Sequence, residues 1–487
     1  MSSHLSRLRT EWCPSIPREL MAGAVATFAL IPEVIAFSFV AGVDPAVGLF
    51  ASFVISIVIA FFGGRPAMVS AAAGSVALVA APLVHAHGVQ YLFAAGILAG
   101  AVQIVFGLLR LGVLMRFVSS SVRTGFVNAL AILIFSAQLP HLVGANGATW
   151  AMLALGLAVI YLLPRLTTAI PSPLVCIVLL TLVGQWLHLP LKTVADLGLL
   201  PDALPTFALP DVPLSLETLR LIALPAFAIA MVGLLESMMT ASVVDDLTDT
   251  PSSKNRECSG LGVANVAASF FGGIAGCGMI GQTVSNVRYG GRGRLSTLFA
   301  GAFLLILMVL LKPWVSQVPV AALVAIMVMV SASTFDWGSL RAVVRHPRLS
   351  SAVMLATVAV TVATDNLAAG VAVGVMLSGV FFTFKVARLL TVTAPAESDD
   401  GALQIYTVAG QVFFASADLL VEAFDVREVA GRPVRIDVSG AHFWDITAVA
   451  ALDKVVQRLR KYGSTVEVIG MDARSTAMAA RLLPRTD

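Results

Sequence analysis

Long runs of apolar residues fill the chain from residue 20 to about residue 390, and short polar segments separate them. A helix needs about 20 apolar residues to cross the hydrocarbon core of a bilayer. The pattern predicts fourteen spans, several of them shorter than this, at residues 20–41, 46–62, 67–86, 91–110, 117–138, 148–163, 172–188, 219–244, 258–272, 278–289, 295–311, 319–332, 351–364 and 367–389. We therefore expect an all-α polytopic membrane domain over residues 20–390.

Glycine interrupts two of these predicted spans. The third contains MVSAAAGSVALVAAP (68–82) and the tenth contains GCGMIGQTVSNVRYGG (276–291). The first and eighth spans also match, since each is long and has a carboxylate near its middle, Glu33 in one and Glu236 in the other. Seven spans separate the members of each pair, so the second half must be inverted relative to the first. Paired broken spans in two such halves predict the substrate site of a transporter.

The distribution of charge agrees with this number of spans. Of the 487 residues, 12% are charged and 58% are hydrophobic, which excludes an ordinary soluble protein. With the N-terminus inside, eighteen Lys and Arg residues up to residue 390 fall in cytoplasmic segments and only Lys192, Arg220 and Lys312 fall outside. This asymmetry predicts that both termini are cytoplasmic. Residues 1–19 lack the apolar segment of a signal peptide and form a cytoplasmic segment. The net charge of +3 does not indicate nucleic-acid binding.

The composition changes after TVTAPAESDDG (391–401), which we interpret as a linker. Residues 402–487 alternate apolar strands with amphipathic helices and predict a small soluble α/β domain. In this tail, LQIYTVAGQVFF (403–414) predicts a hairpin-like strand pair, and DITAVAALDKVVQRLRKYG (445–463) predicts a helix. The tail has no Walker loop, GxGxxG or catalytic triad, so we expect a regulatory or assembly module and no enzyme.

The broken spans predict an anion site. If each is an extended segment followed by a half-helix, the N-termini of the half-helices meet near the midplane with unpaired N–H groups and positive dipole ends. Such ends attract anions without a buried lysine. The candidate lining is Ala73, Gly74 and Ser75 on one side, and Gly281, Gln282 and Thr283 on the other. Arg288, near the cytoplasmic end of the tenth span, is expected to extend towards the interface instead of binding substrate.

The two membrane carboxylates predict a coupling ion. Beside an anion site, Glu33 or Glu236 can carry a proton with the substrate or bind a cation. Thr240 follows Glu236 by one turn, as a second cation ligand would, and Phe37 has the same offset from Glu33 and can form a wall of the site. The alternative is structural: a neutral Glu that bonds to backbone freed by Pro32, or that joins two helices. The acidic stretch at 243–258 has no metal-loop spacing and predicts a solvated loop with a helix cap.

Four segments carry a resemblance to a known family. IPEVIAFSFVAGVDPAVGLFAS, GLLESMMTASVVDDLTDTPSSKNRE and GQTVSNVRYGGRGRLSTLFAG resemble the SulP sulfate permeases, the solute carrier 26 anion transporters, and VSGAHFWDITAVAAL is similar to their C-terminal STAS domain. The chain departs from the family at three places. Glutamine is common where Glu33 stands, other members have a positive residue where Gln282 stands, and residues 445–448 replace the usual D-S-S-G.

The resemblance implies a uracil-permease-like fold of seven plus seven inverted spans. Spans 1–4 and 8–11 would form a mobile core and spans 5–7 and 12–14 a gate, working as an elevator in a homodimer with the STAS domain at the cytoplasmic face. It implies an anion pocket at Phe37, Ser75, Gln282 and Thr283. It further implies cation ligands at Glu236 and Thr240, and proton coupling at Glu33.

Together these features predict a proton-coupled secondary transporter in a bacterial inner membrane. The expected substrate is a C4-dicarboxylate such as fumarate, or sulfate or bicarbonate. The alternatives are sodium-coupled bicarbonate uptake and an anion-sensing scaffold that signals through the STAS domain. We expect no resident cofactor or metal, with H⁺ as the coupling ion and Na⁺ as the alternative. The expected partners are the small anion, membrane lipid, a second copy of the chain and a cytoplasmic partner of the STAS domain.

Overall fold

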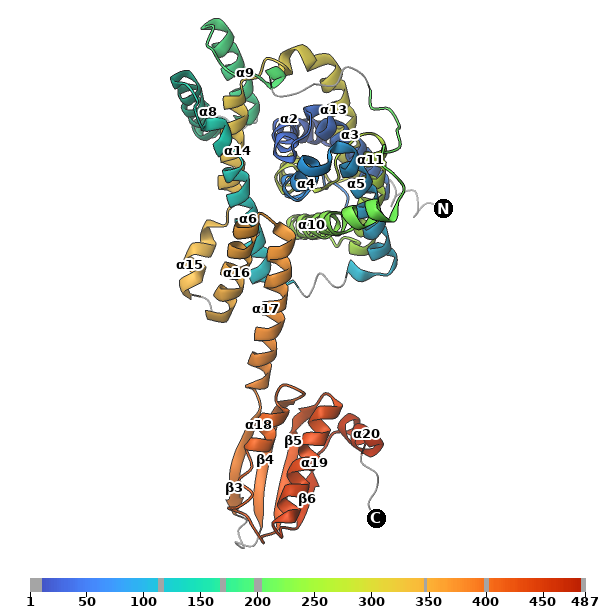
Figure 1. The fold of residues 1–487 in the computed structure, drawn as a ribbon, viewed down its shortest axis with the longest axis vertical. Coiled ribbons are helices and arrows are strands. Elements are labelled where there is room, and N and C mark those ends of the chain that lie inside the picture. The colour runs from blue at the N-terminus through green and yellow to red at the C-terminus, as the bar shows by residue number, and fades with distance from the viewer. Residues whose placement is uncertain are drawn as a thin grey trace. The chain divides into compact units, whose positions relative to one another are not determined.

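The computed structural model describes residues 11–112, 118–166, 172–196, 204–345, 348–397 and 403–482. The chain forms two compact units, residues 1–375 and residues 376–487 (Figure 1). Parts of the predicted N-terminal segment (1–10), the fifth span (117), the linker (398–401) and the start of the tail (402) lie outside the described residues.

Within the described residues, a helix lies at each of the fourteen predicted spans. These helices are α2 (Ile16–Ala41), α3 (Pro45–Phe62), α4 (Gly74–His87), α5 (Val89–Leu108), α6 (Ser120–Ser136), α8 (Gly147–Leu166), α9 (Ser172–Trp186), α10 (Leu216–Thr248), α11 (Lys254–Phe270), α12 (Ile280–Arg288), α13 (Arg294–Val315), α14 (Val320–Thr334), α16 (Arg348–Thr364) and α17 (Leu367–Ala387). The short helices α7 (Leu139–Leu142) and α15 (Trp337–Arg345) lie in connections. By length and composition, seven of the described helices are long and apolar enough to cross a membrane.

Proline and glycine set the ends of the first helices. Helix α2 has a proline in its first turn and ends where Gly42 adopts a left-handed conformation with φ of 73°. Helix α3 then starts directly at Pro45. Pro32 lies inside α2, and the helix continues through it although proline removes one backbone donor.

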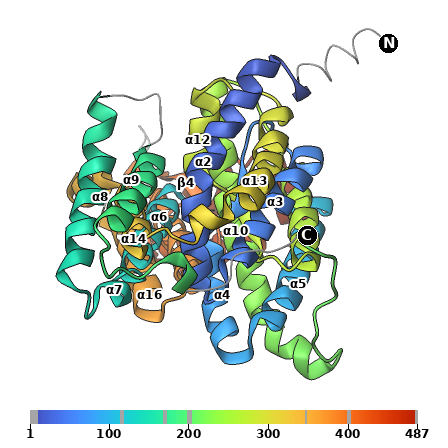
Figure 2. The ribbon, with the colours of Figure 1, turned by 90° about the horizontal axis from the view of Figure 1, so that it is seen from above.

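The helices of the first unit pack in two groups. In one group α11 packs against α5 and α3, α13 packs against α2 and α3, and α10 packs against α4 and α5. In the other group α16 and α14 pack against α6, and α8 packs against α14 and α9. Figures 1 and 2 show the two groups side by side from two directions. The first contains elements from predicted spans 1–4 and 8–11, and the second contains elements from spans 5–7 and 12–14.

The two broken spans contact each other through a short sheet. Strands β1 (Ser70–Ala72) and β2 (Gly276–Gly278) pair antiparallel, with Ala71 opposite Cys277. A Cβ atom at Gly276 would lie 2.0 Å from the carbonyl oxygen of Ala71, so the close approach of the two strands requires glycine there. The strands end directly before α4 and α12, and both half-helices therefore begin in the middle of the first group.

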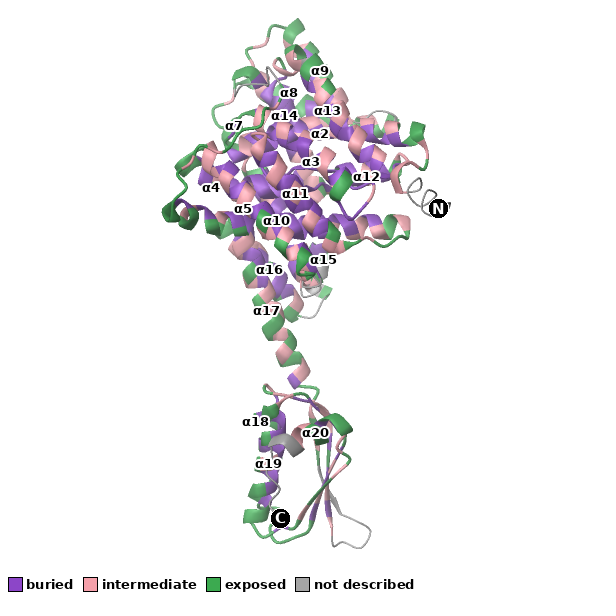
Figure 3. Ribbon diagram, turned by 90° about the vertical axis from the view of Figure 1, so that its right-hand side faces the viewer, coloured by how far each residue is buried: buried purple, intermediate pink, exposed green. Residues whose placement is uncertain are grey.

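Burial separates the inner helices from the outer ones in the first unit. Figure 3 shows mostly buried residues on α3 and α11 and many exposed ones on α8. The exposed residues of α8 include Trp150, Tyr161 and Leu162, each half exposed. Large apolar side chains on the outside of a helical bundle are expected where lipid surrounds it.

The second unit has a four-stranded sheet with its own apolar core. The strand order is β3 (Thr391–Glu397), β4 (Gln404–Val412), β5 (Val434–Phe443) and β6 (Val466–Ile469), and the helices are α18 (Ala417–Glu422), α19 (Ile446–Lys461) and α20 (Ala473–Leu482). Strand β3 is antiparallel to β4, and the other pairs are parallel. The hairpin predicted at 403–414 is wrong: this segment is a single strand that continues through Gly410, and its antiparallel partner is β3, inside the segment interpreted as a linker.

Candidate functional site

A cavity of about 500 Å³ lies between the two groups of helices in the first unit. Helix α2 lines it with the row Val25, Ala29, Glu33 and Phe37, four residues apart and therefore on one face of the helix. The opposite wall comes from α6 and α14 and includes Phe126, Val127, Leu130, Ile134, Met329, Val330, Ser333 and Thr334. Both half-helices begin at this cavity, since Gly74 and Ser75 of α4 and Ile280, Gly281 and Gln282 of α12 line it.

Helix α12 presents a polar face to the cavity. Ile280 lines the cavity at the N-terminal end of this helix. The other lining residues are Gly281, Gln282, Ser285 and Arg288, together with Tyr289 directly after the helix. At about 100° per residue these positions fall within one side of the helix, whereas Thr283 points to the other side. The cavity therefore has a line of polar groups from the first turn of α12 to its last.

Gln282 gives the cavity an unused hydrogen-bond donor. Gln282 is 1% exposed, and its Nε2 atom makes no hydrogen bond of standard length among the described residues, although the Glu33 carboxyl group interacts with the same side chain at longer range. A buried amide without a partner is costly, and a ligand that accepts its hydrogen removes that cost. Glu33 lines the same cavity from α2. A donor that favours an anion thus shares the site with a carboxyl group that can hold a proton.

Glu236 is held by both halves of the chain. Its Oε2 atom accepts hydrogen bonds from the hydroxyl of Ser75 and from the thiol of Cys277, the latter at 3.0 Å. Ser75 belongs to α4 and Cys277 to β2, so one carboxyl group on α10 joins the two broken spans. Glu236 also lines the cavity, so it both joins the two broken spans and belongs to the site.

Three predicted site residues lie behind the lining and not in it. The hydroxyl of Thr283 donates to the carbonyl of Val69 at 3.2 Å and accepts from the amide of Val69 at 3.0 Å. The hydroxyl of Thr240 lies 2.9 Å from the carbonyl oxygens of Glu236 and Gly278. Ala73 is buried directly before α4. These residues support the broken spans, and their side chains are outside the set that faces the cavity.

The glycines that begin the two half-helices have different surroundings. A Cβ atom at Gly74 would lie 2.7 Å from Cε1 of Phe37, so the aromatic ring packs directly on this glycine. A Cβ atom at Gly281 would meet nothing within 4 Å. Phe37 thus packs against α4 and lines the cavity, which stays open at Gly281.

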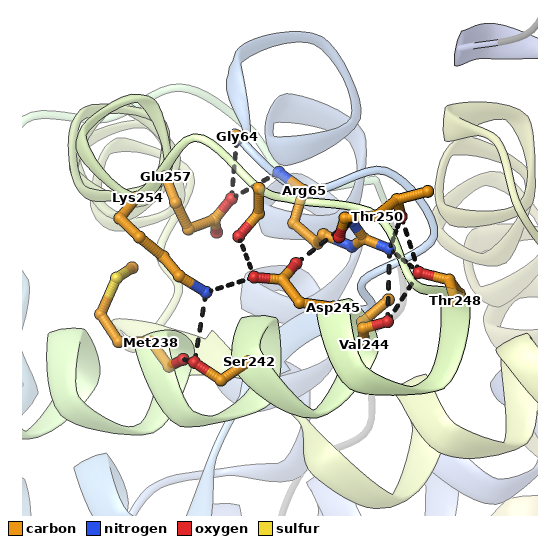
Figure 4. Close-up of polar contacts among 11 residues, drawn as sticks. Gly64, Arg65, Met238, Ser242, Val244, Asp245, Thr248, Thr250, Lys254 and Glu257 are labelled. Carbon is orange, nitrogen blue, oxygen red and sulfur yellow. Dashed lines mark hydrogen bonds and ion pairs between the residues drawn. The ribbon is translucent and has the colours of Figure 1, made fainter.

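A polar cluster supports the loop that leads into β1 (Figure 4). Arg65 forms an ion pair with Asp245 at 3.1 Å and donates to the carbonyl of Thr250 at 2.9 Å. Lys254 contacts Asp245 at 2.9 Å, and Glu257 accepts from the amides of Gly64 and Arg65 at 2.7 and 3.1 Å. The solvated loop predicted at 243–258 is therefore wrong for Glu257, which is fully buried in α11 with its Oε2 atom bonded to two backbone amides. Within the described part of the chain, no group of three or more His, Cys, Asp or Glu residues could hold a metal ion.

Sequence reasoning assigned no site role to Ser285 and Tyr289, and it placed Arg288 at the interface. The spacing of positions 281, 285 and 288 could have grouped Ser285 and Arg288 with Gly281, because these positions share one helix face. Neither the sequence nor that spacing says which face of α12 meets the cavity.

Comparison with known proteins gives the family. The sulfate permease family model matches residues 16–154 and 145–357, and the STAS domain model matches residues 393–482. The putative sulfate transporter YbaR of Bacillus subtilis is 50% identical over 475 residues, which cover 98% of each chain.

Two solved structures give the fold. The transmembrane domain of a cyanobacterium bicarbonate transporter, BicA, matches with a TM-score of 0.67 and 27% identity over 73% of this chain and 97% of that one. The murine Slc26a9 anion transporter in the inward-facing state matches with a TM-score of 0.84 over 99% of this chain and 90% of that one, and at 17% identity it speaks for the fold alone. The predicted family is confirmed: the chain belongs to the sulfate permease (SulP, solute carrier 26) family, as a multi-pass membrane anion transporter with a C-terminal STAS domain and not an enzyme.

Proposed function

We propose that the protein is a proton-coupled symporter that brings an anion into the cell. The anion binds in the cavity between the two groups of helices, and candidates are a C4-dicarboxylate such as fumarate, sulfate or bicarbonate. The single observation that carries the proposal is the buried amide of Gln282 at the start of α12, which has no hydrogen bond of standard length and lies near Glu33 in the same cavity.

The anion is bound by dipoles and donors. The first N–H groups of α4 and α12 have no acceptor within their own helices, and both helices begin at the cavity. Their positive ends favour negative charge, and the Gln282 amide adds a side-chain donor. The apolar wall from α6 and α14 excludes water, which strengthens these interactions.

The proton is carried at Glu33. An ionised carboxylate in this cavity repels an anion, and a neutral carboxyl group does not. Substrate binding therefore favours the protonated form, and release of the substrate favours release of the proton. This linkage makes the proton gradient a driving force for uptake.

Alternating access follows from movement of the helices that carry the broken spans. The contacts of Glu236 with Ser75 and Cys277 and the β1–β2 pair tie both halves of that group together, and support its movement as one rigid core. The helices with α6 and α14 act as the gate. This division corresponds to the inverted seven-plus-seven repeat, and we propose that the transporter works as a homodimer in a bacterial inner membrane.

Uptake by proteoliposomes tests the coupling. Labelled fumarate, sulfate and bicarbonate are supplied under an inward proton gradient without sodium, and separately under a sodium gradient at equal pH. Accumulation with the proton gradient alone supports the proposal. Accumulation that needs sodium alone contradicts proton coupling and favours the second candidate, sodium-coupled bicarbonate uptake.

Two observations favour this second candidate: the similarity to the bicarbonate transporter BicA and a group of oxygen atoms near β2. The hydroxyl of Ser75 meets the carboxyl group of Glu236, and the hydroxyl of Thr240 meets the backbone carbonyls of Glu236 and Gly278. Oxygen atoms of this kind bind hard cations.

A further inference from the structure

We infer that Arg288 binds the second negative charge of a dianionic substrate whose two charges are separated. This inference rests on the proposed anion site and names the substrate class that fits it. The proposed site explains one charge, which the start of α12 and Gln282 neutralise. Arg288 is the last residue of α12 and lines the same cavity.

The guanidinium of Arg288 is free to take a ligand. Arg288 is exposed, and none of the hydrogen bonds or ion pairs between described residues engages it. Two other arginines near this end of the core have acidic partners: Arg65 pairs with Asp245, and Arg294 pairs with Glu11 at 2.7 Å. An arginine that lines a cavity and has no acidic partner is available to an anion in that cavity.

The spacing along α12 suits a ligand with two charged ends. Gln282 and Arg288 are six residues apart, which corresponds to about 9 Å between their Cα atoms. A helical side chain leans towards the N-terminus, so the guanidinium can cover the preceding turn at Ser285 and approach the first turn. The carboxyl carbons of an extended C4-dicarboxylate lie about 4 Å apart, the trans spacing of consecutive Cα atoms. One carboxylate can therefore meet the first turn while the other meets Ser285 and Arg288.

Charge also favours this class. With Glu33 and Glu236, the two carboxyl groups that line the cavity, both protonated, Arg288 contributes the one full positive charge on the α12 face of the cavity, and the helix ends contribute about half a charge each. These groups together balance two negative charges. Bicarbonate has a single charge and cannot engage both ends, and sulfate has two charges on one centre.

Binding by the purified full-length transporter tests this inference. Dissociation constants for fumarate, sulfate and bicarbonate are measured for wild type, Arg288→Gln and Arg288→Lys. We expect Arg288→Gln to weaken fumarate binding about tenfold or more, the loss of one charge-assisted contact, and to change bicarbonate binding less than twofold. Arg288→Lys keeps the charge and recovers part of the fumarate affinity. The effect on sulfate is expected to be smaller than on fumarate.

Arg341→Gln is the matched control, because Arg341 is an exposed arginine on α15 that does not line the cavity. It is expected to bind all three anions as wild type does, and thermal unfolding in detergent checks that each variant is folded. Unchanged fumarate affinity in Arg288→Gln, or an equal loss for all three anions, would overturn the inference. Failure of the proposed anion site is distinct, since wild type itself would then bind none of them.

Discussion

Glu33 belongs to a row of α2 whose members all line the cavity, and its carboxyl group is the one proposed to move with the substrate. Replacement by glutamine keeps the shape and polarity but cannot exchange a proton. We expect Glu33→Gln to bind the anion and to lose proton-driven accumulation. A gradient of one pH unit drives up to tenfold accumulation per proton in wild type and none in this variant.

Uptake into proteoliposomes with and without a pH gradient measures this difference. Glu217→Gln is the control, because Glu217 is an exposed carboxylate in the first turn of α10 and lies outside the cavity lining. If Glu33→Gln keeps the pH dependence of wild type, Glu33 does not carry the proton.

The two glycines that begin the half-helices give opposite predictions. Because a Cβ at Gly281 meets only open space, Gly281→Leu should fold normally and block anion binding by filling the cavity. Because a Cβ at Gly74 meets the ring of Phe37, Gly74→Ala should cost about 1–3 kcal/mol of stability. Thermal unfolding and anion binding of both variants separate the two effects. Wild-type affinity in Gly281→Leu would place the anion elsewhere.

At the residue scale, the sequence predicted positions along the helices better than it predicted directions around them. Gly281, Gln282 and Thr283 were expected together, but each step turns the side chain by about 100°. Gln282 therefore reaches the cavity while Thr283 bonds to Val69 behind it. The rotation of α12 is set by packing with distant elements, and no local pattern contains that information.

At the element scale, Asp445 is a cap that can be tested. Its Oδ1 atom accepts from the amide of Ala448 at 2.9 Å and begins α19, while its Oδ2 atom accepts from the amide of Phe414 at 2.8 Å. Asp445→Ala leaves both amides without these partners and should cost about 1–2 kcal/mol. Hydrogen exchange of the α19 amides in the full-length protein should then be roughly 5–30-fold faster.

Asp453→Ala is the matched control on the same helix. Its carboxylate accepts only from Gln457 on the surface of α19, a contact worth a few tenths of a kcal/mol. Equal exchange rates in the Asp445→Ala and Asp453→Ala variants would show that the cap contributes nothing.

Helix ends were predictable because apolar runs and proline or glycine mark them directly, as at Pro45 and Gly42. The partners of the strands were less predictable from the sequence. The segment 403–414 contains turn-like Gly410, yet the strand continues and pairs with β3. An alternating pattern predicts a strand and does not name its neighbour, because pairing is decided by the whole sheet.

At the scale of the whole molecule, every residue that lines the cavity lies in the first compact unit, between positions 25 and 334. Truncation after residue 390 keeps α17 whole and removes the STAS domain. We expect the truncated protein to retain anion uptake within about threefold of wild type, since no lining group is lost. Uptake per folded molecule in proteoliposomes is the measurement. Loss of uptake in a folded truncated protein would favour an obligatory role of the STAS domain in signalling or assembly.

The order of the apolar spans and the change of composition near residue 390 predict where the membrane part ends and the soluble tail begins, because each has its own composition. For the cavity, the sequence predicted only that the two broken spans meet there. Its far wall on α6 and α14 comes from apolar helices that look like any other span in sequence.

The pairing of β1 with β2 also has a consequence for biosynthesis. The two strands are separated by about 200 residues, and a ribosome that adds about 5–20 residues per second completes β2 roughly 10–40 s after β1. For that interval the backbone groups of β1 that pair with β2 lack that partner, while the carbonyl of Ser70 and the amide of Ala72 can bond to the hydroxyls of Ser56 and Ser52 in the first half. The first half of the core therefore lacks its β1–β2 pairing until the second half has been synthesised. Its assembly is completed late in translation, and a nascent chain stopped between the halves presents an unfinished strand to the insertion machinery.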